Sequence, residues 1–210
     1  MYLRTEGVIL KRRNFGEADR ILTIYTKDSG KITALAKGVR RPKSKKAGHL
    51  EIGSWCKIFT VRGKNMDLLT EVELKHAFGI KDFTEERANK IYHFLELVDA
   101  LTAEHQKNPG VFNLLISFLK KINNENNFDL VSSVFKIKLL SNLGFFAAST
   151  LSDSQAKWVI QILEEEDFET AKSQIRLSEQ GYLKLLSFLD SMVESLTERK
   201  LTTVRFLNGQ

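Results

Sequence analysis

The chain has 210 residues and a net charge of +6, with 32 Lys and Arg against 26 Asp and Glu. Hydrophobic residues make up 42% of it and charged residues 28%, which is average globular usage and excludes collagen-like, low-complexity and mostly disordered chains. No apolar run reaches the roughly 18 residues that a membrane-spanning helix needs, and the first 13 residues show no signal-peptide pattern. We therefore expect a soluble, cytoplasmic protein with no membrane partner.

The single cysteine, Cys56, restricts the chemistry further. One cysteine forms no internal disulfide, no CxxC redox pair and no four-cysteine zinc site. Its surroundings, the sequence WCKIF, predict a small buried hydrophobic residue in a strand.

Positive charge is concentrated at the N-terminal side. Residues 1–82 hold 18 Lys and Arg against 9 Asp and Glu, whereas residues 83–210 hold 14 against 17. A field of one sign on one part of a chain points to a polyanionic partner and says nothing about the fold.

The first 80 residues predict strands. Stretches rich in β-branched and aromatic residues alternate with short turns, such as the one at Asp28–Gly30. The predicted strands are Tyr2–Arg13, Ala18–Thr26, Lys31–Val39, Ser54–Val61 and Asp67–Ala77. Connections this short favour an antiparallel barrel, and a five-stranded, partly open barrel of the oligonucleotide-binding (OB) type fits both the count and the charge.

From about Asp82 onward, apolar residues recur at helical spacing. Caps and breaks delimit five helices: Thr84 to about His105, a helix opened by Asn108 and Pro109, Phe128–Leu143 closed by Gly144, Asp153–Glu165 with a Ser152/Gln155 capping box, and Ser178–Leu196. The predicted fold class is α+β, with an N-terminal five-stranded OB-fold barrel in residues 1–80 followed by an all-α helical domain in residues 81–210.

Residues that could carry catalysis form no constellation. His49, His76, His93 and His105 stand at no metal-ligand spacing, so we expect them at the solvent or the edge of the core, and no Gly-rich phosphate loop or nucleophile motif is present. The acidic run Glu164–Asp167 predicts a solvated, fraying helix end. We therefore expect no enzyme activity, no metal and no cofactor.

Three basic clusters stand out instead. Six of the ten residues 37–46 are cationic and none is acidic, while Lys11–Arg13 closes the first strand and Arg62 with Lys64 lies in the last strand connection. In a small barrel such segments can converge on one face and follow a phosphate backbone. Of the interleaved aromatic residues Phe15, Tyr25, Trp55 and Phe59, Phe15 is the best candidate for stacking on a base. The candidate DNA-binding residues are Lys11, Arg12, Arg13, Phe15, Lys37, Arg40, Arg41, Lys43, Lys45, Lys46, Arg62 and Lys64.

Two other functions compete with DNA binding. The first is a non-catalytic scaffold whose basic domain binds another polyanion, either an acidic protein or a membrane surface. The second is a nuclease on the same barrel, which the separation of Asp19, Asp28 and Asp67 along the sequence disfavours.

Motifs in both halves resemble one family. The stretches Thr5–Arg13, Phe15–Leu22 and Thr26–Ser44 are similar to the N-terminal signature of the bacterial DNA repair protein family RecO. Leu139–Phe145, which reads LLSNLGF, resembles that family's LLxxLGy segment, and Lys200–Leu207 resembles its closing basic segment.

This resemblance implies a recombination mediator without a catalytic site. Members have an OB fold and a helical domain, bind single- and double-stranded DNA, anneal complementary strands and help load RecA with RecR and, in some lineages, RecF. It also implies association with the nucleoid and capture of the C-terminal tail of single-stranded DNA-binding protein by the helical half. The cations available there for such a tail are Lys120, Lys121, Lys136, Lys138 and Arg205. Many members carry four zinc-binding cysteines after the LLxxLGy segment, but residues 145–182 contain none, so no zinc is expected.

Overall fold

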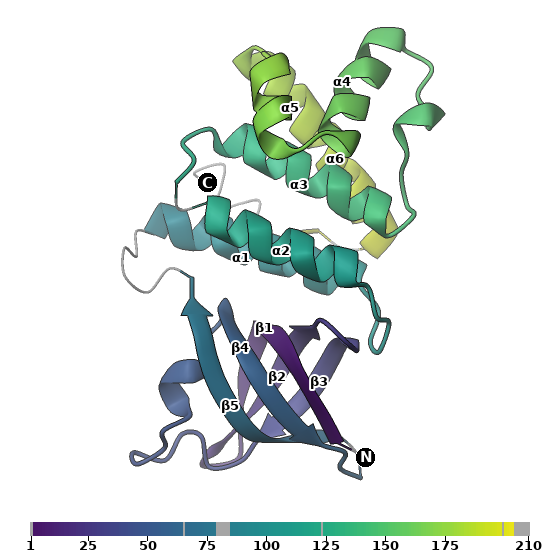
Figure 1. Cartoon of the computed structure of the whole chain (residues 1–210). Helices are drawn as coiled ribbons and strands as arrows, with labels where there is room; N and C mark the ends of the chain where they lie inside the picture. Colours follow the sequence, from purple (N-terminus) through teal and green to yellow (C-terminus); the bar gives the residue numbers. More distant parts are fainter. Residues whose placement is uncertain (1, 65, 79–84, 123, 199, 204–210) are drawn as a thin grey trace.

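The computed structural model describes residues 2–64, 66–78, 85–122, 124–198 and 200–203 (Figure 1). Its N-terminal part is a closed barrel of five strands: β1 (Tyr2–Phe15), β2 (Asp19–Thr26), β3 (Gly30–Ala36), β4 (Ser54–Val61) and β5 (Asp67–Ala77). The strand order is β1-β2-β3-β5-β4, and β4 pairs back to β1. The predicted OB-fold barrel is confirmed, with strand bounds close to those expected.

The barrel interior is filled by apolar side chains at alternate positions of the strands. The interior is built from side chains that point inward at every second position, among them Ile24, Ile32 and Ile58, each no more than 1% exposed. A bulge between Ile9 and Lys11 interrupts the alternation of β1. Up to that point the alternation holds, with Ile9 inside the barrel and its neighbours Val8 and Leu10 in the core on the helical side.

One seam of the barrel is closed by a segment from the helical half. β3 and β5 pair in parallel over only two positions, starting at Ala34. Before that point, Lys31 of β3 bridges to Glu104, and the backbone N–H of His105 donates to the carbonyl of Lys31 at 2.8 Å. We call residues 102–107 the seam segment. It replaces the missing part of β5 as the neighbour of β3.

Six helices follow within the described residues: α1 (Glu85–Leu101), α2 (Pro109–Lys121), α3 (Phe128–Asn142), α4 (Ser154–Glu165), α5 (Phe168–Gln174) and α6 (Glu179–Thr197). Most predicted caps are confirmed, since Asn108 accepts from Val111 N at the start of α2 and Gly144 (φ 76°) follows α3. The predicted helix start at Thr84 and the basic segment beyond residue 203 lie outside the described residues.

The acidic run Glu164–Asp167 closes α4, and three of its four side chains are exposed, which confirms the expected solvated helix end. The expected fraying is wrong, because Glu164 and Asp167 make specific hydrogen bonds. The carboxylate of Glu164 accepts from Ser141 Oγ at 2.6 Å and from the backbone N–H of Ala148 at 2.8 Å. Asp167 caps α5, a short helix that the sequence analysis does not predict. At the other end of α4 the cap is Asp153, which accepts from Ala156 N, rather than the expected Ser152. Hydrogen bonds from distant residues to Glu164, and local capping bonds to Asp167, therefore hold this end of α4 in place.

The helices stack on the barrel in two layers. α1 and α2 lie against the barrel, and α3 to α6 lie beyond them (Figure 1). The buried cluster of the helices continues into the barrel through Val8, Leu10 and Tyr25. Inside the helical part, the rings of Phe94 and Phe135 stack with centroids 4.2 Å apart. The barrel and the helices consequently share one apolar core.

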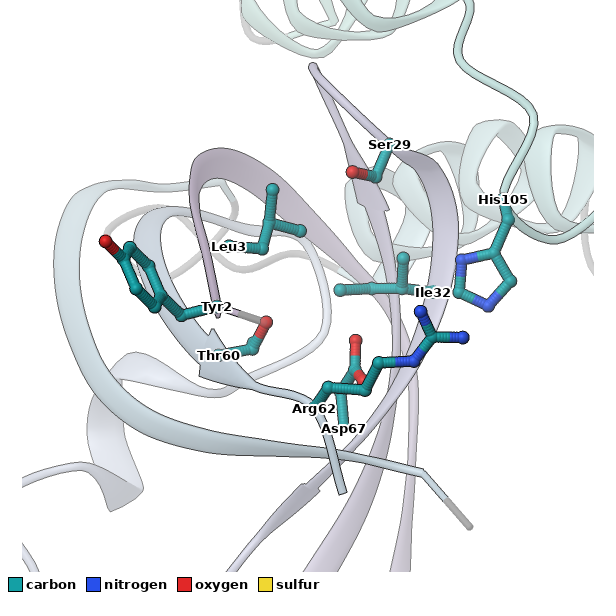
Figure 2. Close-up of a pocket in the computed structure, with 8 residues that line it drawn as sticks. All are labelled: Tyr2, Leu3, Ser29, Ile32, Thr60, Arg62, Asp67 and His105. Atoms are coloured by element: carbon teal, nitrogen blue, oxygen red, sulfur yellow. The ribbon is translucent and has the colours of Figure 1, made fainter. Parts of the chain in front are cut away.

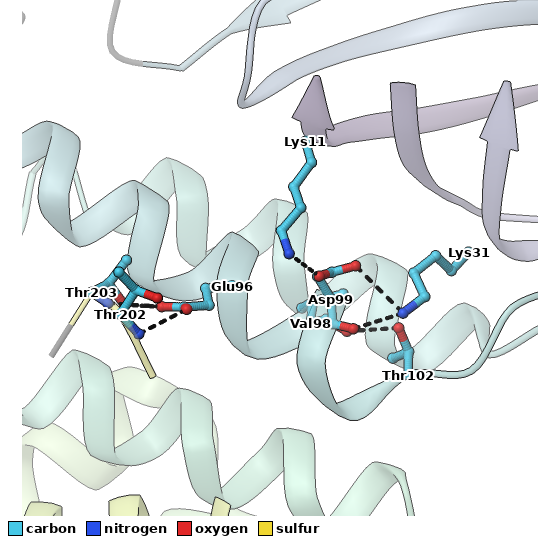
Figure 3. A network of polar contacts seen from close by, with 8 residues as sticks. All are labelled: Lys11, Lys31, Glu96, Val98, Asp99, Thr102, Thr202 and Thr203. Carbon is cyan, nitrogen blue, oxygen red and sulfur yellow. Dashed lines mark hydrogen bonds and ion pairs between the residues drawn. The ribbon is translucent and has the colours of Figure 1, made fainter. Parts of the chain in front are cut away.

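Ionic contacts reinforce this junction. Asp99 of α1 pairs with Lys11 at 2.5 Å, and Lys31 donates to the backbone carbonyl of Asp99 at 2.6 Å (Figure 3). Burial alone would raise the pKa of Asp99, but the two ammonium groups outweigh it and lower that pKa below its ordinary value. Asp99 is thus held as a carboxylate between two strands.

The end of the described chain returns to α1. Glu96 accepts from the backbone N–H groups of Thr202 at 2.8 Å and Thr203 at 2.9 Å, and from Thr203 Oγ1 at 2.6 Å (Figure 3). Thr203 Oγ1 also lies 2.8 Å from Nδ1 of His93. His93 is fully buried in the core, so the expected place of this histidine at the solvent or core edge is wrong. The returning chain thus gives Nδ1 of His93 a hydrogen-bond partner, whereas Nε2 is buried without one among the described residues.

Candidate nucleic-acid interface

Two of the three basic clusters meet at one end of the barrel. The β1–β2 turn contacts residues 37–46, because Asp19 Oδ1 accepts from Gly38 N at 2.7 Å and the carbonyl of Ala18 accepts from Arg40 N at 2.8 Å. Residues 11–20 and 37–51, which we call the basic end, hold ten Lys and Arg against three Asp and Glu. Such an excess of one sign raises the local concentration of anions.

The cations of the basic end fall into two groups. Five of them contact the protein itself: Lys11 pairs with Asp99, Arg12 and Arg20 pair with Glu51, Arg40 donates to the carbonyl of Gly16, and Lys46 donates to that of Thr70. Five exposed cations have no ion pair or hydrogen bond within the described part of the chain: Arg13, Lys37, Arg41, Lys43 and Lys45. These five are free to neutralise an external anion.

Arg62 and Lys64 lie elsewhere. β1 runs antiparallel to β4, with Tyr2 opposite Val61 at one end, whereas Phe15 at the other end pairs with Asp19. β1 has 14 residues, which corresponds to about 45 Å at 3.3 Å per residue. The structure therefore joins the clusters at Lys11–Arg13 and residues 37–46 but places the third cluster at the opposite end of the barrel.

The four candidate aromatic residues have different surroundings. Phe15 is 49% exposed beside the basic end, as expected for a stacking residue. Tyr25 is fully buried, and Phe59 contacts the ring of Tyr2 at 5.6 Å. Trp55 lies between the ammonium groups of Lys75 at 4.2 Å and Lys120 at 5.2 Å. Phe15 alone among the four lies beside the unpaired cations.

A cleft opens at the end of the barrel where Arg62 lies, next to the seam segment (Figure 2). Its volume is about 430 Å³, and it adjoins a second cavity of about 370 Å³ that Lys64 lines. We call this the seam cleft. The side chains of Leu3 and Ile32 line it together with polar groups from four separate segments: Ser29, Thr60, Arg62, Asp67 and His105. Sequence reasoning missed it, because these residues are far apart along the chain and only Arg62 belonged to a charge cluster.

The described residues offer neither a cluster of metal-binding side chains nor a reactive thiol. No group of three or more His, Cys, Asp or Glu side chains that could hold a metal ion occurs in the part of the chain that the structure describes. Cys56 is buried as expected, its Sγ donates to the carbonyl of His49 at 3.2 Å, and burial raises its pKa to about 12. A thiol with so high a pKa is a poor nucleophile at neutral pH.

Most candidate cations of the helical half are already engaged. Lys121 pairs with Glu169, Lys138 donates to the carbonyl of Glu164, and the almost fully buried Lys136 pairs with Asp190 at 2.5 Å. Arg205 lies outside the described residues. No helix among the described residues is long and apolar enough to cross a membrane.

A closed barrel with this strand order, a basic end and six helices stacked on one side defines the class: an OB-fold protein with a helical C-terminal part. Comparison with models of protein families shows which family the chain matches. Residues 1–78 match the family described as "Recombination protein O N terminal" and residues 90–152 match "Recombination protein O C terminal". The chain belongs to the recombination protein O family.

Curated relatives agree with this assignment. The chain is 33% identical over 142 residues to "DNA repair protein RecO" of Dehalococcoides mccartyi strain 195, a match covering 68% of this chain and 56% of the relative. It is 33% identical over 145 residues to the protein of that name from Acetivibrio thermocellus, covering 69% and 58%. Against Alkaliphilus metalliredigens the identity is 33% over 147 residues, covering 69% and 59%. The matched region thus spans somewhat more than half the length of these relatives.

Proposed function

We propose that this protein binds single- and double-stranded DNA through the basic end of its barrel and anneals complementary strands. The observation that carries the proposal is the group of five exposed cations without a protein partner in the described residues, beside the exposed ring of Phe15. Membership of the recombination protein O family, whose relatives are named for DNA repair, supports a role in DNA repair and homologous recombination.

Annealing has a simple physical basis in this arrangement. Cations that neutralise phosphates on two strands lower their mutual repulsion and release counterions. Contacts to phosphates carry no sequence information and leave the base edges free to pair. The protein then acts by binding and needs no catalytic group.

The wider role proposed is that of a recombination mediator. In it the protein works with RecR, and in some lineages RecF, to load RecA onto DNA coated by single-stranded DNA-binding protein, whose C-terminal tail the helical half contacts. We place this role in the cytoplasm, at the nucleoid. Support for these partners comes from family membership alone.

Fluorescence anisotropy with labelled single-stranded and duplex oligonucleotides tests the binding step, and mixing complementary strands in the same samples tests annealing. Binding that ignores sequence, weakens steeply with salt and accelerates annealing is the expected result. Vesicles containing anionic lipid serve as the matched polyanion. If the protein binds these vesicles and no DNA at low salt, the basic end belongs to another partner and the proposal is wrong.

A further inference from the structure

The seam cleft gathers polar side chains that have no protein partner. Within the described residues no hydrogen bond or ion pair engages the side chains of Ser29, Thr60, Arg62, Asp67 and His105. Other polar groups of the barrel behave differently, since Asp19 caps Gly38 N and Asp28 accepts from Thr5 Oγ1 at 2.6 Å. Convergent polar groups with unused hydrogen-bonding capacity, set around a concave surface, are the usual mark of a ligand site.

The backbone holds His105 in an unusual conformation at this point. Its φ is 58°, which puts a residue with a side chain in the left-handed region. The hydrogen bond from His105 N to the carbonyl of Lys31 fixes the conformation, and Figure 2 shows the imidazole on the same side of the cleft as the guanidinium of Arg62. Backbone strain that the surroundings enforce is often retained where a side chain has a function.

The chemistry of the cleft fits one nucleotide. The half-buried Leu3 provides an apolar wall for a flat ring, and the carboxylate of Asp67 can accept from a ring amino group. The guanidinium of Arg62 can stack on a base or bind a phosphate. A cavity of about 430 Å³ has room for a base with its sugar. In duplex DNA, the ring faces are stacked and the pairing edges are occupied, so only an unpaired base can use these groups.

We propose that the seam cleft binds one unpaired base of a DNA strand, with Arg62 and Lys64 contacting the phosphates beside it. This inference rests on the proposed function and adds a second contact at the end of the barrel opposite the basic end. The basic end binds any phosphate backbone, whereas the seam cleft adds affinity for single strands only. Discrimination between unpaired and paired DNA therefore arises at the seam cleft.

A triple variant tests the proposal on the full chain. Arg62→Gln, Asp67→Asn and His105→Asn together leave the net charge unchanged, and Asn tolerates the left-handed conformation at position 105. The matched control, Arg13→Gln with Glu17→Gln, is also neutral in net charge but lies at the basic end. Fluorescence anisotropy measures the affinity for a single strand containing 2-aminopurine and for a duplex of equal length. Competition with excess dAMP then tests whether a free nucleotide displaces either DNA. Thermal unfolding followed by circular dichroism checks that each variant is folded.

The triple variant should bind the single strand about tenfold more weakly, lose the 2-aminopurine signal and keep duplex affinity within about twofold. The control should keep the ratio of the two affinities. Free dAMP should displace neither probe, because it carries a single phosphate and no adjoining strand to contact the basic end. If the wild type binds neither DNA, the proposed function fails. If the wild type binds DNA and the triple variant shows the same preference for single strands as the wild type, only the inference about the seam cleft is wrong. That inference is also wrong if dAMP binds as tightly as the single strand.

Discussion

Two ionisable side chains, His93 and Lys136, lie fully inside the helical core. Burial lowers the pKa of His93 well below its ordinary value, and the positive charge of Lys136 lowers it further. Burial also lowers the pKa of Lys136, although Asp190 opposes that shift. His93 is therefore neutral in the folded protein, while Lys136 depends on its pair with Asp190.

Protonation of His93 links the free energy of unfolding to pH. The unfolded chain binds a proton at this position below about pH 6.5, and the folded protein does not, so stability is complete above that pH and falls as the pH is lowered through it. We expect the melting temperature to drop between pH 7 and pH 5. A His93→Gln variant should show a much flatter dependence, whereas the exposed His76→Gln should keep the wild-type dependence. Parallel curves for wild type and His93→Gln would contradict this account.

At the scale of elements, strands and long helices could be predicted from the sequence because their signals are local. β-branched runs, turns and caps such as Asn108 and Ser178 lie next to the residues they affect. The short helix α5 has only seven residues, too few for a periodic pattern. The seam segment was also missed, because its pairing with β3 joins residues more than 70 positions apart and replaces part of β5.

Closure of the seam depends on Gly30. Its φ is 66°, and a Cβ there would lie 1.9 Å from the carbonyl oxygen of Gln106. Gly30→Ala should force the seam segment away from β3 and destabilise the protein by about 3 kcal/mol in urea unfolding. Gly16, with φ 55° and no atom near its Cβ position, is the matched control, and Gly16→Ala should cost only about 1 kcal/mol. Equal losses for both variants would mean that backbone conformation, and not seam contact, determines the effect.

The whole molecule consists of two units that share one core. We propose the division into residues 1–80 and 81–210; the two family models match residues 1–78 and 90–152. Leu10 and Tyr25 of the barrel belong to the helical core, and Asp99 binds two barrel lysines. In the sequence, the boundary between the units is visible because the spacing of apolar residues changes from that of strands to that of helices. The shared core is not visible, because apolar residues that face out of the barrel look the same in the sequence as those that face into it.

A shared core predicts cooperative unfolding of the two units. The chain has two tryptophans, so in a Trp158→Phe variant Trp55 reports on the barrel and on its contact with α2, while far-ultraviolet circular dichroism reports mainly on the helices. Both signals should give one midpoint in urea. Leu10→Ala should lower both midpoints equally, with a loss of about 3 kcal/mol. Separate midpoints would show that the barrel and the helices unfold independently.

At the same scale, the candidate DNA-binding site could be predicted only in part. Charge runs identify cations, but they do not show which of them the fold engages, as Lys11 with Asp99 and Lys46 with Thr70 illustrate. Nor do they give the direction of strands, which separates Arg62 and Lys64 from the basic end. The five unpaired cations are therefore a sharper set than the sequence alone provides.

The measurement that tests the central claim most directly is the salt dependence of single-strand binding. It compares the wild type with a variant in which the five unpaired cations, Arg13, Lys37, Arg41, Lys43 and Lys45, are changed to Gln. Each lost phosphate contact reduces the slope of log affinity against log salt by about 0.7, so for five contacts we expect the variant's slope to be shallower by about 3.5 and its affinity to be lower. An unchanged slope, with DNA binding intact, would show that the basic end does not hold the phosphate backbone.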